Sequence, residues 1–317
     1  MKQHDRIVSA YCLGYQSWTV VPHQMEEDFK EMRDMGFGAV NLSFSENELK
    51  YARRAFELQV RLAHAAGLKV NVIPSRLGGR FAGAPFMPSV WLAQNPQYAL
   101  YSKPGALPVA CVESPAFRAW VREFMETLLR DYELDGIIWD EPKSHGLISR
   151  HPDTIAKFGE HPTEENMIDS FVEFLEEISG FCRELRPGMR QTMFVQKNYN
   201  PYFTGKAARI ESLDYFGYDG NMARQSVFQE EPRWHKYRLE EVWERTVAEC
   251  AQTGKKSFAL VENMLMPSAA VDEFEENFER YLSRYTPDHL AIYYYAHNNE
   301  DPERVHAAVK RLMKKYL

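Results

Sequence analysis

Short apolar runs alternate with amphipathic segments along almost the whole chain. The apolar runs have the length of buried strands rather than of core helices. Between them, apolar side chains recur at the spacing of one helix face, as Met25, Phe29 and Met32 do. This alternation predicts strands at residues 7–12, 39–44, 68–73, 136–140, 191–196, 213–218, 257–262 and 290–296.

The predicted helices begin with residues that favour helix starts. Ser114-Pro115 and Asp301-Pro302 each place a capping side chain before a proline at the first helical position. A helical pattern follows each of the eight strands, which is the requirement of a (β/α)8 TIM barrel. We therefore predict an α/β fold of this type, with a single catalytic domain over residues 1–317.

Two connections are longer than the usual link between elements, at residues 74–114 after the third strand and 219–238 after the sixth. Long loops in a compact domain are commonly functional. A doubly wound sheet is the main alternative, but it needs a glycine-rich turn directly after an early strand. Gly78-Gly79 lies inside the first long loop instead, which favours the barrel.

Composition excludes several classes of partner. The 317 residues carry 38 Lys+Arg and 45 Asp+Glu, a net charge of −7, which argues against nucleic acid or an anionic membrane as the main partner. No apolar run approaches the ~20 residues of a membrane span, and the first residues lack an apolar signal core. Because the four cysteines are far apart, we expect reduced thiols and a cytoplasmic protein.

Functional sites of TIM barrels lie at the carboxyl ends of the strands and in the loops that follow. These positions are rich here in carboxylates, amides and aromatic rings, which bind sugar hydroxyls and stack on pyranose faces. They contain no phosphate-binding glycine loop and no GxSxG serine motif, and we expect no cofactor and no resident metal. The substrate-binding candidates are Tyr15, Trp18, Arg76, Trp139, Asn198, Asp219, Tyr295 and His297.

Three acids are the strongest candidates for chemistry. Asp140 and Glu141 directly follow one apolar strand, and Glu262 ends another. Buried carboxylates cost free energy unless they are partnered, so either function or an ion pair has to explain them. Lys143 and Arg76 are the candidate partners in the purely structural interpretation.

Carboxylates on opposite parts of one barrel mouth can flank a glycosidic bond. One would be a general acid with a raised pKa, and the other a nucleophile or a base that activates water. A separation of ~5–5.5 Å would indicate retention of configuration, and ~6.5–9.5 Å inversion. A permanent cation held against either carboxylate would argue against this assignment.

Part of the chain resembles (β/α)8-barrel glycoside hydrolases. The resemblance lies in residues 95–98, 111–118 and 132–141, the last of which read YELDGIIWDE. Clan A of these enzymes carries Asn-Glu-Pro after the fourth strand and Glu after the seventh. The resemblance implies Glu141 as acid/base and Glu262 as nucleophile, with Asp140 in the place of the clan's Asn.

Other interpretations stay open. A resemblance to retaining α-glycosidases implies Asp140 as nucleophile and Asp219 as acid/base. A metal-dependent sugar isomerase or epimerase would use Glu141, Asp219, Glu262 and His297 as ligands for Mn²⁺ or Mg²⁺. A third alternative is a catalytically silent sugar-binding barrel. We predict a glycosidase whose partner is a small oligosaccharide or glycoside. The sugar, the anomer and the oligomeric state stay open.

Overall fold

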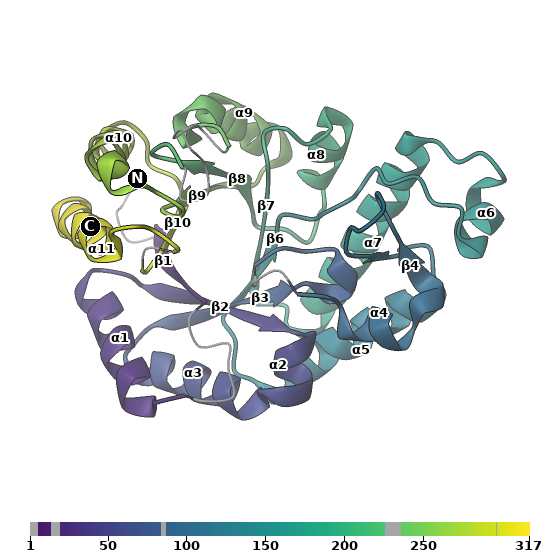
Figure 1. Ribbon diagram of the computed structural model, residues 1–317, viewed down its shortest axis with the longest axis horizontal. Coiled ribbons are helices and arrows are strands. Elements are labelled where there is room, and N and C mark those ends of the chain that lie inside the picture. Colours follow the sequence, from purple (N-terminus) through teal and green to yellow (C-terminus); the bar gives the residue numbers. More distant parts are fainter. Residues whose placement is uncertain (1–5, 14–19, 84–86, 226–235, 296) are drawn as a thin grey trace.

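The computed structural model describes residues 6–13, 20–83, 87–225, 236–295 and 297–317. Its centre is a closed barrel of parallel strands in the order β1-β10-β9-β8-β7-β6-β3-β2 (Figure 1). The strands are β1 (Ile7–Cys12), β2 (Ala39–Ser45), β3 (Lys69–Ser75), β6 (Gly136–Asp140), β7 (Arg190–Val195), β8 (Tyr215–Asn221), β9 (Lys256–Glu262) and β10 (His289–Tyr293). Every predicted strand is present, and the (β/α)8 barrel is confirmed.

Helices surround the barrel on its outer side (Figure 1). Two of them begin as the sequence predicts. The Ser114 side chain accepts a hydrogen bond from the N–H of Phe117, and Asp301 accepts one from Arg304 at 3.1 Å. The helices are α1 (Pro22–Asp34), α2 (Glu46–Tyr51), α3 (Arg53–Ala65), α4 (Val90–Gln94), α5 (Pro115–Asp131), α6 (Pro152–Phe158), α7 (Glu164–Leu185), α8 (Pro201–Ala207), α9 (Trp243–Thr253), α10 (Val271–Arg284) and α11 (Pro302–Tyr316).

Alternate strand residues fill two separate cores. One set packs between the strands and the helices, and includes Ile137 and Trp139 of β6. The other set fills the inside of the barrel, and includes Ile138 of the same strand. Because side chains alternate along a strand, Asp140 falls on the inner side, at the carboxyl end of β6. The pleat therefore turns this acid toward the barrel mouth.

The long connection after β3, predicted as a functional loop, contains secondary structure in its described part. It contains α4 and a small antiparallel pair, β4 (Ala99–Leu100) with β5 (Val109–Ala110). Glu46 at the start of α2 holds it, because its carboxylate accepts hydrogen bonds from the N–H groups of Gly78 and Trp91 and from the Ser89 hydroxyl. A buried acid with several donors fixes the segment that lies beside the barrel mouth.

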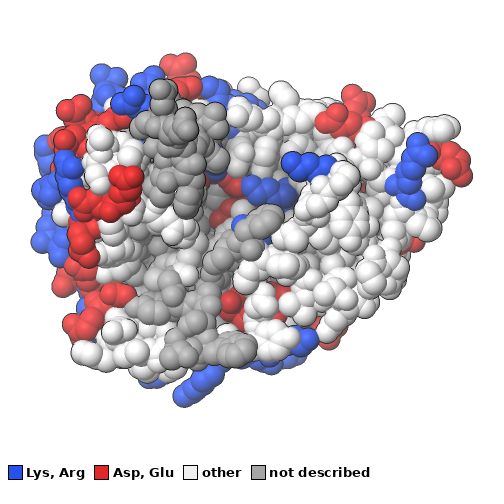
Figure 2. Space-filling model, viewed as in Figure 1, with Lys and Arg blue, Asp and Glu red and all other residues white. Residues whose placement is uncertain are grey.

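Charge is unevenly spread over the face in Figure 2. Side chains of both signs crowd its left edge, while much of its right half carries few charges. Red and blue side chains also meet in the hollow near the centre. All four cysteines are buried, and none forms a disulfide within the described part of the chain. Across the described residues, no helix combines the length and apolarity needed to cross a bilayer.

Candidate active site at the carboxyl ends of the strands

A cavity of about 420 Å³ opens at the carboxyl ends of the strands. Its wall combines apolar side chains from the barrel interior, such as Phe194 and Leu260, with an unusual density of charge. The charged residues that line it are Arg76, Asp140, Glu141, Lys143, Asp219, Lys236 and Glu262. A pocket with a few convergent polar groups is the expected form of a small-molecule site.

Four buried carboxyl groups come to this cavity from three strands. Asp140 and Glu141 lie at the end of β6, Asp219 in β8 and Glu262 at the end of β9, each at most 6 % exposed. One carboxylate oxygen from each of Glu141, Asp219 and Glu262 lies within 4.8 Å of the others. The fold thus brings together acids that are far apart in the sequence.

Lys236 lies at the centre of these acids. Its ammonium donates to Glu141 Oε1 at 2.5 Å, to Glu262 Oε1 at 2.9 Å and to the Asp219 carboxylate. Lys143 contacts the other oxygen of Glu141. The cationic partner that would argue against a catalytic pair is therefore present, and any functional proposal has to include it.

Neutral donors complete the network around the acids. Gln196 Nε2 donates to Glu141 Oε1 at 2.7 Å, and Asn221 Nδ2 donates to Glu262 Oε2 at 3.1 Å. The Tyr237 hydroxyl donates to Asp219 Oδ1 at 3.1 Å, and the Tyr11 hydroxyl is 3.4 Å from Asp140 Oδ2. Buried charges need such partners because they have lost their water.

The acids have different proton affinities. Burial raises the pKa of Glu141, but a hydrogen bond from Asp219 and the ammonium groups of Lys236 and Lys143 hold it well below its usual range. Burial raises the pKa of Asp219 well above its usual range against the pull of Lys236, with the charges of Glu141 and Glu262 adding to the rise. Burial and then the Glu141 charge raise the pKa of Asp140 to about 7. Glu141 thus releases its proton more readily than usual, whereas Asp140 and Asp219 hold theirs more tightly.

Backbone geometry at the cavity is strained. Arg76 and Glu141 have φ values of 56° and 39°, in the left-handed region that side chains disfavour. Gly83 has a φ of 90°, and a Cβ there would lie 2.4 Å from Ile73 Cγ2 and 2.8 Å from Ser75 Oγ. Only glycine allows the loop after β3 to pass this close to the end of the strand. Strained residues of this kind cluster at functional sites.

The structure brings together most of the predicted polar site residues. Asp140, Glu141, Glu262 and Asp219 share the cavity. Arg76 and His297 also line it. Tyr15 and Trp18 lie outside the described residues.

Three predicted substrate-binding residues lie elsewhere. Trp139 is fully buried on the outer side of the barrel, where its Nε1 donates to Gln191 at 3.0 Å, so its position excludes it as a sugar platform. Asn198 is exposed and does not line the cavity. The Tyr295 ring stacks on His306 at 4.7 Å, pointing away from the cavity.

Sequence reasoning missed two central residues. Tyr293, assigned to the strand interior, lines the cavity because β10 ends at this residue. Lys236 lies in the long connection after β8, where no periodic pattern marks it. A register argument would have found Tyr293, since it lies two residues after Ala291 on the inner side of the same strand. No sequence signal identifies Lys236.

The carboxylates have the chemistry of a divalent-cation site, but an ammonium already binds them. Glu141, Asp219 and Glu262 are the only described group of three or more metal-ligating side chains with this spacing. His297 lines the cavity but is not a member of the group. The ligand set of the isomerase alternative is thus brought together only in its three acids, and Lys236 contacts all of them.

The fold matches those of solved glycoside hydrolases. A β-galactosidase from the haloarchaeon Halorubrum lacusprofundi has a TM-score of 0.70 at 12 % identity, over 98 % of this chain and 58 % of that one. The catalytic domain of a Paenibacillus polymyxa β-amylase has a TM-score of 0.60 at 10 % identity, over 99 % of both chains. An endo-1,4-β-mannanase from Rhizomucor miehei has 0.59 at 10 % identity, over 98 % of this chain and 95 % of that one.

These similarities establish the fold and no more, since identity is so low. The chain spans less than two thirds of the length of the β-galactosidases, 58 % of the first and 59 % of one from Marinomonas. No protein-family model and no curated protein sequence matches the chain. The chain therefore has the (β/α)8 barrel of glycoside hydrolases, and its function has to be argued from the cavity.

Proposed function

We propose that the protein is a glycoside hydrolase that cleaves a small oligosaccharide or glycoside. The observation that carries this proposal is the convergence of Glu141, Asp219 and Glu262 at one cavity, with one oxygen of each within 4.8 Å. This upper limit lies below the ~6.5–9.5 Å gap that inverting enzymes leave for water and is nearer the ~5–5.5 Å of retaining enzymes. We therefore propose retention of configuration.

The charge distribution supports a division of roles. A general acid must hold a proton at working pH, and burial gives Asp219 that property. A nucleophile must be ionised, and its hydrogen bond to Asp219 together with Lys236 and Lys143 keeps Glu141 in that form. Environments that push two pKa values apart identify an acid and its partner.

This division differs from the one implied by the clan A resemblance, where Glu141 carries the proton and Glu262 attacks. It is closer to the α-glycosidase pattern, in which the acid follows the sixth strand as Asp219 does. Glu262 binds both Lys236 and Asn221, and it is retained as the second candidate for the nucleophile. Asp140 lies beside Glu141, and burial together with the Glu141 charge raises the pKa of Asp140 to about 7.

Lys236 occupies the carboxylates that the proposed reaction needs. Its ammonium contacts the three carboxylates at the point where an acetal would lie, so substrate has to displace the ammonium or share the carboxylates with it. Hydroxyl groups of a sugar can replace the bonds that the carboxylates then lose. The same contact favours a second candidate function, a silent sugar-binding barrel in which Lys236 permanently neutralises the acids.

One experiment separates the two candidates. A panel of aryl glycosides is assayed, with and without a chelator, on wild type and on Glu141→Gln, Asp219→Asn and Glu262→Gln. Glu160→Gln, at an exposed position, is the matched control. We expect losses of at least ~10³-fold for Glu141→Gln and Asp219→Asn, as removal of a nucleophile or a general acid causes.

The outcomes are distinct. Azide restores turnover in the variant that lacks the nucleophile, which decides between Glu141 and Glu262. Activity that disappears with the chelator contradicts a metal-free glycosidase. Absence of hydrolysis across the panel, with sugars still binding, supports the silent barrel. Losses below tenfold in all three variants contradict the proposal.

A further inference from the structure

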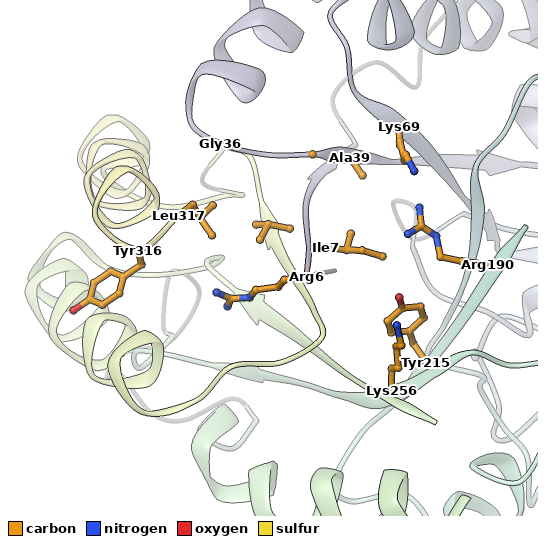
Figure 3. Close-up of a pocket in the computed structure, with 12 residues that line it drawn as sticks. Arg6, Ile7, Gly36, Ala39, Lys69, Arg190, Tyr215, Lys256, Tyr316 and Leu317 are labelled. Atoms are coloured by element: carbon orange, nitrogen blue, oxygen red, sulfur yellow. The ribbon is translucent and has the colours of Figure 1, made fainter. Parts of the chain in front are cut away.

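The opposite mouth of the barrel holds a second cavity, of about 560 Å³, that the proposed chemistry does not use. Three basic residues begin strands there: Lys69 in β3, Arg190 in β7 and Lys256 in β9. Figure 3 shows Lys69 and Arg190 pointing toward each other, and Lys256 beside Tyr215. Tyr215 of β8 and Lys256 of β9 are also paired in register on neighbouring strands.

The strand register explains why these cations share an open space. Gly136 of β6 lies between β3 and β7, in register with Asn71 and Arg190. A Cβ at Gly136 would lie only 2.4 Å from Asn71 Oδ1. No side chain of β6 therefore separates Lys69 from Arg190 at this level of the barrel. The cavity therefore lies between the Lys69 and Arg190 side chains.

No acid neutralises these cations within the described part of the chain, where none of the three has an ion-pair partner. The acids at this end of the barrel are bound elsewhere. Asp135, Asp214 and Asp288 each accept a hydrogen bond from the backbone N–H that follows one of the cations. The first two also bind side chains of the outer helices, His64 and Arg183 respectively.

We propose that this mouth binds a phosphate group. Two ammonium groups and the Arg190 guanidinium line this cavity, with Arg6 also in its wall, in a chain whose net charge is −7, and like charges around one cavity repel each other until an anion offsets them. A doubly charged tetrahedral oxyanion can contact cations on several sides, whereas one carboxylate would leave most of them uncompensated. The Tyr215 side chain lines the same cavity and adds a hydroxyl donor.

The site is independent of the proposed glycosidase chemistry, because it lies at the amino ends of the strands. The phosphate can be free inorganic phosphate or the ester group of a small metabolite. Both sources present the same oxygens to Lys69, Arg190 and Lys256, so the shared chemistry defines the site. The two sources differ because an ester would also place its organic part against the rest of the cavity wall.

The test is titration calorimetry of the full chain with inorganic phosphate, pyrophosphate and glucose 6-phosphate, each against chloride at equal ionic strength. We expect saturable binding and a rise in the melting temperature. Arg190→Gln and Lys256→Gln should each weaken binding at least about tenfold, since each removes a charge-assisted hydrogen bond. Lys103→Gln, at an exposed loop position, is the matched control and should bind as wild type does.

The outcomes decide the proposal. Tighter binding of glucose 6-phosphate than of inorganic phosphate identifies an ester as the ligand class, and equal or weaker binding identifies the free ion. Lys256 is exposed, so Lys256→Gln should fold even if Arg190→Gln does not. The proposal is overturned if no ligand binds beyond the chloride control, or if Lys256→Gln binds phosphate as tightly as wild type.

Discussion

The two mouths of this barrel handle charge in opposite ways. At the carboxyl ends of the strands, three of the four buried acids bind one lysine, and hydrogen bonds from neutral side chains complete the network. At the amino ends, Lys69, Arg190 and Lys256 line a cavity without ion-pair partners among the described residues. The first mouth is internally compensated, and the second is open to an external counter-ion.

The comparison shows that the burial of charged side chains, more than their number, decides whether they need partners within the protein. Arg190 is only partly buried and Lys69 and Lys256 are exposed, so water screens their repulsion. The acids at the other mouth have lost their water and depend on Lys236 and on neutral donors. Charge at the carboxyl mouth is therefore coupled to folding stability and to proton affinity, whereas charge at the amino mouth is free to act in binding.

Removal of Lys236 should give the largest effect on stability. Lys236→Met removes the ammonium that contacts all three buried acids and leaves only Lys143 near Glu141, which should lower the free energy of unfolding by about 3–5 kcal/mol at neutral pH. Urea denaturation measures this loss, and Lys236→Arg is the control that keeps the charge. A loss below about 1 kcal/mol would mean that the acids do not depend on this ammonium.

Gly83→Ala tests how tightly the carboxyl mouth is packed. The added Cβ would overlap Ile73 and Ser75, so we expect a loss of about 1–3 kcal/mol beyond the cost of the positive φ. Gly105→Ala is the control, because Gly105 has a similar φ of 77° with no atom within 4 Å of the new Cβ. If thermal denaturation shows equal losses for both variants, the overlap has been absorbed by movement of the loop.

Asp140→Asn tests the raised proton affinity at this mouth. The native pKa of about 7 lies above the ordinary value of 3.8, so the folded state keeps a proton that the unfolded state releases. Stability contributed by Asp140 is therefore lost as pH rises from about 4 to 7. Urea unfolding at both ends of this window should show a smaller decline for Asp140→Asn than for wild type. The exposed Asp34→Asn is the control, and identical declines in all three proteins would contradict the assignment.

The smallest effect is expected at the amino mouth. Lys256→Gln relieves repulsion at an exposed position, so the free energy of unfolding should change by no more than about 0.5 kcal/mol. Any change should be stabilising in phosphate-free buffer and should reverse when phosphate is added. A marked destabilisation without phosphate would show that the contact of the Lys256 ammonium with the Tyr215 ring, at 5.9 Å, stabilises the fold.

Sequence periodicity located the strands, and with them most of the candidate site. Asp140, Glu141, Asp219 and Glu262 were identifiable because each lies at or near the end of an apolar run, a local property of the chain. Trp139 was misassigned because adjacent strand residues face opposite sides, so an inward Asp140 requires an outward Trp139. The alternation of inward and outward side chains along the strand was therefore enough to predict the outward orientation of Trp139.

Lys236 could not be predicted because its role depends on tertiary structure. It lies 17 positions beyond Asp219 in a long connection, and only the closed barrel brings its ammonium to three acids from different strands. The protonation pattern was equally inaccessible, since it depends on burial and on distances between side chains. Periodicity thus predicts which groups reach the mouth but not how they share charge.

The most direct test of the central claim, that Asp219 supplies a proton during glycoside cleavage, is the dependence of kcat/KM on the leaving group. Asp219→Asn and wild type are compared on the preferred glycoside with a good and with a poor aryl leaving group. We predict a loss of at least ~10³-fold for the poor leaving group and a much smaller loss for the good one, which departs without a proton. Equal losses for both leaving groups, or losses below tenfold for both, would contradict the claim.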